Sequence, residues 1–211
     1  MNPLACWQDL TWAVVDFETT GFHHYYDAIV EVAVVRMHQG RVLDRWSTLV
    51  NPQRSIPHDA TEVHGITDFA VHQAPTFLGA LPMLVHHLRD AVPVAYSASF
   101  DRRMLRAAAE KAGLDDLPLL ALDPELPWID PLYWIRALDR FDKANGGNKL
   151  PEACARWGVP LDKAHSAAHD AEATGALLWK MAPFIGRMTL SELLRRQLVK
   201  NGRTGKDSPP A

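Results

Sequence analysis

Two carboxylates separated by one residue fall at the end of an apolar segment near the start of the chain. Asp16 lies near the end of residues 12–17 (WAVVDF), and Glu18 follows this segment directly, before the turn-forming residues TTG. Side chains alternate along a strand, so Asp16 and Glu18 share one face while Phe17 points into the core. Two like charges repel unless a cation neutralises them, and carboxylate oxygens favour Mg²⁺ or Mn²⁺. The pair taken alone also fits a solvated strand end.

Two further acids lie at the borders of other predicted elements. Asp101 follows the apolar residues 92–96 and opens a run of strong helix formers, and Asp170 lies near the start of another helical run. Taken singly, Asp101 fits an ordinary helix N-cap and Asp170 fits a first-turn acid that favours the helix dipole. Because ligands commonly bind at the carboxyl ends of strands, we expect Asp101 at the same sheet edge as Asp16.

A histidine precedes Asp170 by five residues. Within one ideal helix, five positions separate two side chains by about 140° around the axis. His165 and Asp170 therefore converge only if His165 lies in the loop before the helix. An imidazole that titrates near neutrality suits a general base, although a surface histidine fits the same spacing.

Three strand-like segments precede the first long helical one. Residues 12–17, 28–37 and 42–50 have the pattern of antiparallel strands, and the HGIT segment at residues 64–67 is expected in a loop. The other expected elements are a helix over 77–88, a strand over 92–96, and helices over 102–112, 131–138, 150–157 and 168–181. A mixed sheet with helices packed on it satisfies this order, so the expected fold class is α/β.

Composition narrows the class of protein. The chain has 211 residues, 47% of them hydrophobic, which fits one domain with a full core. A net charge of −3 excludes an overall basic protein, so any grip on nucleic acid must be local. Two cysteines, Cys6 and Cys154, are too few for a disulfide framework. No segment approaches the length of a membrane span, and we expect a soluble cytoplasmic protein.

The blocks DFETTG, HGIT, SFD and HSAAHDAEAT, in this order, resemble the DEDDh 3′→5′ exonucleases, the group of the bacterial polymerase III proofreading epsilon subunits and ribonuclease T. The resemblance covers residues 12–182. It implies a ribonuclease-H-like fold with a mixed five-stranded sheet and helices packed on it. It also implies two Mg²⁺ or Mn²⁺ ions and a histidine base. The metal ligands then fall on Asp16, Glu18, Asp101 and Asp170, and the base on His165.

Other positions are expected to contact the substrate or to compete for a role. The expected substrate contacts are Thr19, Thr20, Gly21, His64, Ser97 and Phe100. Ser97 stands where the family commonly has Asn, which leaves substrate contact there open. His169 is an alternative base, but the five-residue spacing of His165 matches the family.

The resemblance implies hydrolysis at the 3′ end of single-stranded nucleic acid, with DNA favoured and nucleoside 5′-monophosphates released. The alternatives are RNA 3′ trimming and a non-catalytic nucleic-acid-binding protein of the same fold. We expect an exonuclease domain over residues 1–186, an amphipathic helix over 187–200 with a T-x-x-E capping box at Thr189, and a disordered tail over 201–211. The helix either docks on its own domain or binds a polymerase or other protein partner. The oligomeric state is open.

Overall fold

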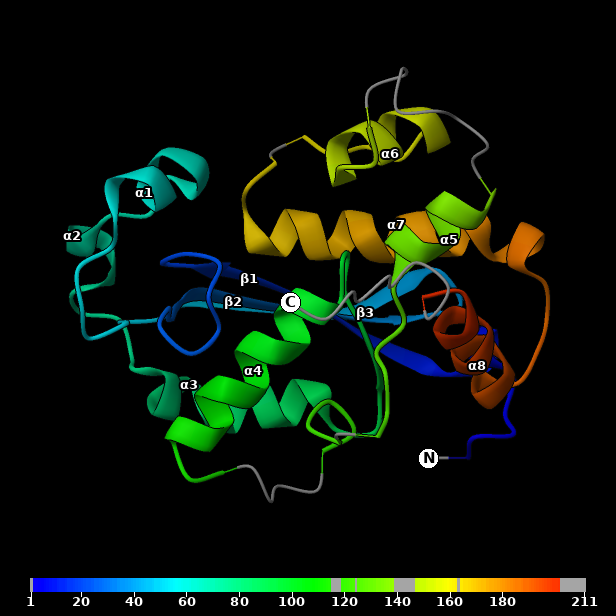
Figure 1. Ribbon diagram of the computed structural model, residues 1–211, viewed down its shortest axis with the longest axis horizontal. Helices are drawn as coiled ribbons and strands as arrows, with labels where there is room; N and C mark the ends of the chain where they lie inside the picture. The colour runs from blue at the N-terminus through cyan, green and yellow to red at the C-terminus, as the bar shows by residue number, and fades with distance from the viewer. Residues whose placement is uncertain (1, 115–118, 124, 139–146, 163, 202–211) are drawn as a thin grey trace, which may run out of the picture.

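A mixed β-sheet lies at the centre of the computed structural model, which describes residues 2–114, 119–123, 125–138, 147–162 and 164–201. The strands follow the order β3-β2-β1-β4, in which β1 is antiparallel to β2 and parallel to β4. Figure 1 shows the sheet between two helical layers, with α7 on one face and α3 and α4 on the other. The strands are β1 (Thr11–Thr19), β2 (Ile29–His38), β3 (Arg41–Leu49) and β4 (Val92–Val94). The predicted α/β class is confirmed.

The predicted fifth strand is wrong for the described part of the chain, where the sheet has four strands. The fifth position holds one parallel bridge between Val94 and Ile129, supported by hydrogen bonds from Ile129 N to Pro93 O (3.0 Å) and from Ala95 N to Ile129 O (3.2 Å). Ile129 lies between Pro127 and Pro131, which have no N–H to donate to a ladder. The two prolines therefore limit this strand to a single bridge.

Two short helices flank the HGIT segment, in a region for which the sequence predicts a loop. Helices α1 and α2 flank Gly65 and Ile66 of the HGIT segment, and Gly65 ends α1 with a φ of 74°. Short helices without a buried stripe give little periodic signal, which explains why they were missed. The helices are α1 (His58–His64), α2 (Asp68–Val71), α3 (Phe77–Leu88), α4 (Ser99–Lys111), α5 (Pro131–Leu138), α6 (Leu150–Trp157), α7 (Ala167–Ile185) and α8 (Leu190–Asn201), and a 3₁₀ helix η1 spans Trp7–Asp9.

Strand β1 separates two hydrophobic cores. Trp12 and Val14 pack in the core under α7, whereas Val15 and Phe17 pack in the core formed with α3 and α4. Asp16 lies in the same alternation as Trp12 and Val14, so it emerges on the α7 face. The strand's buried alternation thus fixes the side of the sheet on which the acids lie.

Helix α7 approaches the sheet closely at Gly175. A Cβ atom at this position would overlap Met37 Sδ and would lie 3.0 Å from Val14 Cγ2. Glycine therefore lets the helix axis come nearer to β1 and β2 than any larger residue would allow. The same helix carries Asp170 in its first turn, so this contact sets the height of Asp170 above the sheet.

Helix α8 docks on its own domain. Thr189 Oγ1 accepts a hydrogen bond from Glu192 N at the helix start (3.2 Å), as the sequence pattern predicted. Leu190, Leu193 and Leu194 are buried in the core that also packs α7. The predicted tail at 201–211 lies outside the described residues except for Asn201, which ends α8. Over the described residues, no helix has the length and apolar character needed to span a bilayer.

Candidate active site

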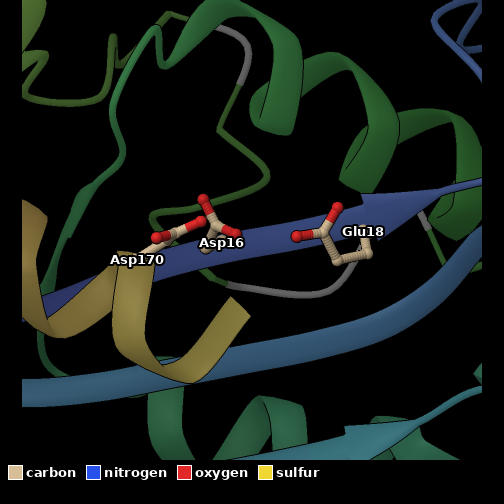
Figure 2. A group of neighbouring side chains, drawn as sticks. All are labelled: Asp16, Glu18 and Asp170. Atoms are coloured by element: carbon tan, nitrogen blue, oxygen red, sulfur yellow. The ribbon is translucent and has the colours of Figure 1, made fainter. Parts of the chain in front are cut away.

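Three carboxylates from distant parts of the chain gather on the α7 face of the sheet. One oxygen from each of Asp16, Glu18 and Asp170 lies within 4.8 Å of the others. Figure 2 shows Asp16 and Glu18 rising from β1, with Asp170 reaching toward Asp16 from α7. Side chains of this kind and spacing are those that hold a hard divalent cation.

Asp170 offers one oxygen to the protein and leaves the other without a protein partner. Its Oδ2 accepts a hydrogen bond from the main-chain N–H of His165 at 3.0 Å. Its Oδ1 is buried and has no hydrogen-bond partner within the described chain. A buried carboxylate oxygen without a donor is costly, and a metal ion is a partner that removes this cost. The donor set therefore fits a divalent cation.

Asp101 is fixed to the strand that carries Asp16. Only 4% of Asp101 is exposed, and its Oδ1 accepts a hydrogen bond from Phe17 N at 3.2 Å. The residue lies inside the first turn of α4, whose N-cap is Ala98, so Asp101 does not cap the helix through the N-cap position. It lies outside the group of three whose oxygens are within 4.8 Å. Asp101 therefore borders the cluster and ties α4 to β1.

Burial raises the pKa of all four acids, and repulsion from neighbouring acids adds to the rise for Asp16, Glu18 and Asp101. Burial and then the charges of Asp101 and Asp170 raise the pKa of Asp16 well above its usual range. Burial and neighbouring acids raise the pKa of Glu18 to about 7. Burial raises the pKa of Asp101 to about 8, although the Phe17 N–H opposes this shift. Burial also raises the pKa of Asp170. Glu18 and Asp101 therefore bind protons near neutral pH unless a cation replaces the protons.

Glu31 is an additional acid beside the cluster that the sequence analysis did not single out. It pairs with Glu18 across β1 and β2, and its charge raises the pKa of both Asp16 and Glu18. Its Oε2 accepts a hydrogen bond from Ala167 N, the first residue of α7, at 3.3 Å. Glu31 is the single acid within the otherwise mostly apolar residues 28–37, and this isolated charge is the sequence feature that could have identified it. Glu31 thus joins the start of α7 to the sheet.

His165 lies in the loop before α7, where the sequence analysis expected it. The residue is exposed, and its φ of 62° is in the left-handed region. Burial raises the pKa of Asp170 and His165 opposes this rise, so the imidazole is near this carboxylate. His169 is also exposed, and its Nδ1 lies 3.0 Å from Ser166 Oγ. The two imidazoles therefore differ in their partners.

His64, at the end of α1, borders the same site. Burial lowers the pKa of His64, and proximity to His165 lowers it further, while the Thr19 backbone raises it. Its Nδ1 accepts a hydrogen bond from Ile66 N at 3.0 Å. Its Nε2 is buried, and the ring also lies within hydrogen-bond reach of the Thr19 backbone. The HGIT segment therefore brings a neutral imidazole next to β1 and His165.

The residues that follow Glu18 form a tight turn. The Thr20 hydroxyl donates to Asp27 Oδ1 (2.9 Å) and accepts from Ala28 N (3.0 Å), so it is engaged within the loop. A Cβ on Gly21 would lie 2.5 Å from Asp27 Oδ2, so the Asp27 carboxylate explains the glycine without any ligand. The Thr19 hydroxyl donates to Gly21 O (2.6 Å). Substrate contact by these three residues remains a prediction.

The turn before α4 depends on a second acid that the sequence analysis missed. Ser97 is exposed with a φ of 60°, and its N–H donates to Asp130 Oδ1 at 3.0 Å. Burial raises the pKa of Asp130 to about 6, and backbone N–H groups oppose this shift. Gln197 of α8 accepts a hydrogen bond from Asp130 N at 3.0 Å. Phe100 is half-buried, with its ring centroid 6.3 Å from that of Phe22.

Comparison with known proteins gives one family. The sequence model of the RNase_T exonuclease family matches residues 13–178. A PolC-type DNA polymerase III from Halalkalibacterium halodurans is 34% identical over 173 residues, which are 82% of this chain and 11% of the polymerase. The chain therefore spans about one-ninth of the length of that relative.

Solved structures give the same fold. Exonuclease X, solved in complex with 5′-overhanging duplex DNA, is 26% identical, with a TM-score of 0.65 over 87% of this chain and 99% of that one. The nuclease domain of 3′hExo, a DEDDh family member solved with rAMP, is 16% identical, with a TM-score of 0.68 over 81% and 90%. The second likeness is a likeness of fold alone.

Proposed function

Because the chain belongs to the RNase_T exonuclease family, we propose that it is a metal-dependent 3′→5′ exonuclease of the DEDDh type that acts on single-stranded DNA. In this proposal it hydrolyses the last phosphodiester bond and releases nucleoside 5′-monophosphates. The observation that carries the proposal is the gathering of Asp16, Glu18 and Asp170 oxygens within 4.8 Å. The buried, unpartnered Oδ1 of Asp170 supports a cation in that group.

We propose that these three carboxylates hold Mg²⁺ or Mn²⁺ and that Asp101 contributes to a second ion. Two such ions supply charge neutralisation at the scissile phosphate and a lower pKa for the attacking water. His165 takes the proton of that water at an imidazole nitrogen, since the residue is exposed beside Asp170. The main-chain N–H of His165 donates a hydrogen bond to the Asp170 carboxylate, so the proposed base and this proposed metal ligand keep their relative position.

The remaining predicted residues receive the terminal nucleotide in this proposal. The neutral imidazole of His64 borders the site next to the Thr19 backbone and His165, which supports a contact with the substrate. Phe100 offers a half-buried ring at the start of α4, and Ser97 offers an exposed hydroxyl. The backbone of Thr19, Thr20 and Gly21 follows Glu18 directly, which supports its contact with the substrate.

DNA is proposed over RNA on the strength of two relatives. One is the polymerase III relative at 34% identity, and the other is exonuclease X, whose solved complex contains DNA. RNA trimming remains the second candidate, because the 3′hExo nuclease domain was solved with rAMP. Discrimination at the 2′ position requires one or two contacts, which a DNA and RNA comparison measures directly.

A single assay tests this function. A 5′-labelled single-stranded DNA oligonucleotide should be shortened stepwise from its 3′ end with Mg²⁺ and stay intact with a chelator. Asp16→Asn should abolish the shortening, and Asp59→Asn, at an exposed position on α1, should not. Activity that survives Asp16→Asn refutes the site. If a matched RNA is shortened and the DNA is not, the assignment moves to RNA trimming. If neither oligonucleotide is shortened, a non-catalytic protein is favoured.

Other proposals concern context. The polymerase relative supports a polymerase partner, and α8 remains the candidate contact, although its buried leucines face its own core. A partner would then meet the outer end of the stripe, where Leu198 is 54% exposed. The division of the chain at residues 186 and 200 and a cytoplasmic location stay predictions, and the oligomeric state stays open.

A further inference from the structure

The loop that follows β1 exposes an unusual number of rings. The five residues 22–26 are Phe22, His23, His24, Tyr25 and Tyr26, and we call them the aromatic loop. Phe22 is 90% exposed, Tyr25 60% and Tyr26 73%. Clustered exposed aromatic side chains on a folded protein mark a binding surface, because their apolar area is otherwise left in water.

The rings of the aromatic loop are already assembled in pairs. His23 and His24 stack with centroids 5.5 Å apart and planes 2° from parallel. His23 also contacts Tyr26, and His24 contacts Tyr25, each with centroids 4.4 Å apart. Pre-assembled rings lose little rotamer freedom on binding, and they offer flat outer faces for a planar ligand.

Basic residues from outside the loop hold its backbone. Lys111 Nζ donates to Tyr25 O at 2.8 Å, and Arg54 donates to Tyr26 O. Asp27 Oδ2 accepts a hydrogen bond from His23 N at 2.9 Å, which closes the turn. Lys111 and Arg54 keep further donors for a ligand, since an ammonium has three and a guanidinium five. Cationic groups thus lie beside the exposed rings.

The aromatic loop runs along α4, away from the acids. Phe22 meets Phe100 at the start of α4, and Tyr25 meets Lys111 at its end. Eleven helical residues separate these two contacts, which is a rise of about 16 Å. At 100° per residue, the exposed Arg103 lies on the same side of α4 as Phe100 and Lys111. Figure 1 shows this dark-blue loop and α4 at the same end of the sheet.

We propose that the aromatic loop, together with Arg103 and Lys111 of α4, binds the nucleotides upstream of the one being removed. This inference rests on the proposed function, because it assigns the rest of the same single strand to a defined surface. Bases stack on the outer faces of the His and Tyr rings, and the phosphates pass the cations of α4. Because the chain has a net charge of −3, it has no overall attraction for phosphates. Exposed rings that stack on bases, next to a local group of basic residues, can supply the affinity for a single strand.

The test separates binding from hydrolysis. With a chelator present to prevent cleavage, fluorescence anisotropy of a labelled single-stranded 12-mer measures affinity alone. The double variant His24→Ala/Tyr25→Ala should weaken this affinity by at least ~10-fold, given the usual strength of stacking per base. Phe184→Ala is the matched control, since it removes a ring that is 68% exposed on α7 and should leave the affinity unchanged. Arg103→Gln should reduce the salt dependence of binding by about 0.7 in log–log slope.

A mononucleotide substrate distinguishes the two proposals. The double variant and the wild type should hydrolyse a p-nitrophenyl ester of thymidine 5′-monophosphate at the same rate. For the 12-mer, the double variant should have a higher KM than the wild type and an unchanged kcat. Wild-type affinity for the 12-mer in the double variant overturns the assignment of the aromatic loop. Failure of the wild type to cleave either substrate, with 12-mer binding still dependent on the loop, refutes the exonuclease proposal and leaves the binding surface standing.

Discussion

At the scale of single residues, the site depends on how Asp170 divides its two oxygens. One accepts the main-chain N–H of His165, and the other is buried without a protein donor. The φ of 62° at His165 turns the chain sharply enough for this bond to form just before α7. A local backbone conformation thus couples the proposed base to a proposed metal ligand.

The two histidines near Asp170 should respond differently to the same substitution. His165→Asn should lower kcat by at least ~100-fold, because it removes the proposed proton acceptor. His169→Asn should change kcat by less than ~3-fold, because its imidazole contacts Ser166. Steady-state kinetics on single-stranded DNA measures both. Equal losses in the two variants would contradict the choice of His165.

Ser97 offers a test of backbone strain. Its φ of 60° is a conformation that Asn adopts more readily than Ser. Ser97→Asn should therefore stabilise the protein by about 0.5 kcal/mol, measured by urea denaturation. Ser99→Asn, at an exposed position on the first turn of α4, is the control and should give no such gain. A loss of stability in Ser97→Asn would show that the Asn side chain clashes in this turn.

At the scale of elements, α7 decides where the third acid stands. It packs on β1 and β2 through Gly175, and Glu31 holds its first residue by a hydrogen bond. Helix α8 has a related role, because its Gln197 accepts a hydrogen bond from the backbone N–H of Asp130. Asp130 in turn holds the turn that leads to Asp101. Helices far apart in the chain thus support neighbouring acids.

Gly175→Ala should move α7 away from the sheet. The added methyl group meets Met37 and Val14, so overpacking should destabilise the protein by about 1–3 kcal/mol and lower Mg²⁺ affinity through the displaced Asp170. Thermal denaturation and Mg²⁺ titration measure the two effects. Adding Met37→Ala removes the larger overlap and should recover part of both losses. If the losses of stability and Mg²⁺ affinity in Gly175→Ala/Met37→Ala equal the sum of the losses in the two single variants, the overlap between the added methyl group and Met37 is not their cause.

At the scale of the whole molecule, the fold keeps several acids close together against their repulsion. Glu18 has a pKa of about 7 and Asp101 of about 8, above their usual 4.5 and 3.8. A raised folded-state pKa means that the folded protein holds protons that the unfolded chain has released. Stability is therefore greatest below the unfolded values and falls as pH rises through the folded ones.

Metal-free protein should lose thermal stability between about pH 5 and about pH 8. We expect its Tm in a chelator to fall by at least ~3 °C over this range and Mg²⁺ to reverse most of the fall at the higher pH. The double variant Glu18→Gln/Asp101→Asn should show a smaller dependence on pH and little response to Mg²⁺. A Tm in the chelator that rises with pH would contradict the shifts.

Much of the molecule was predictable from local pattern. The apolar alternation of residues 12–17 placed Phe17 in the core and Asp16 on the opposite face, because side chains in a strand alternate regardless of tertiary context. The capping pattern at Thr189 predicted the start of α8 for the same local reason. The order of blocks was also enough to identify the family, since a set of motifs in fixed order is far more specific than one motif.

Other features exist only because distant segments meet. The proximity of Asp170 to Asp16 depends on the close approach of α7 at Gly175, which nothing in the local sequence encodes. The single bridge at the fifth strand position depends on whether Ile129 meets β4. The role of Glu31 depends on its position opposite Glu18 in the neighbouring strand. The sequence alone determined the types of side chain, their faces and their order. Tertiary packing decided distances, burial and therefore charge, because desolvation and repulsion depend on neighbours in space.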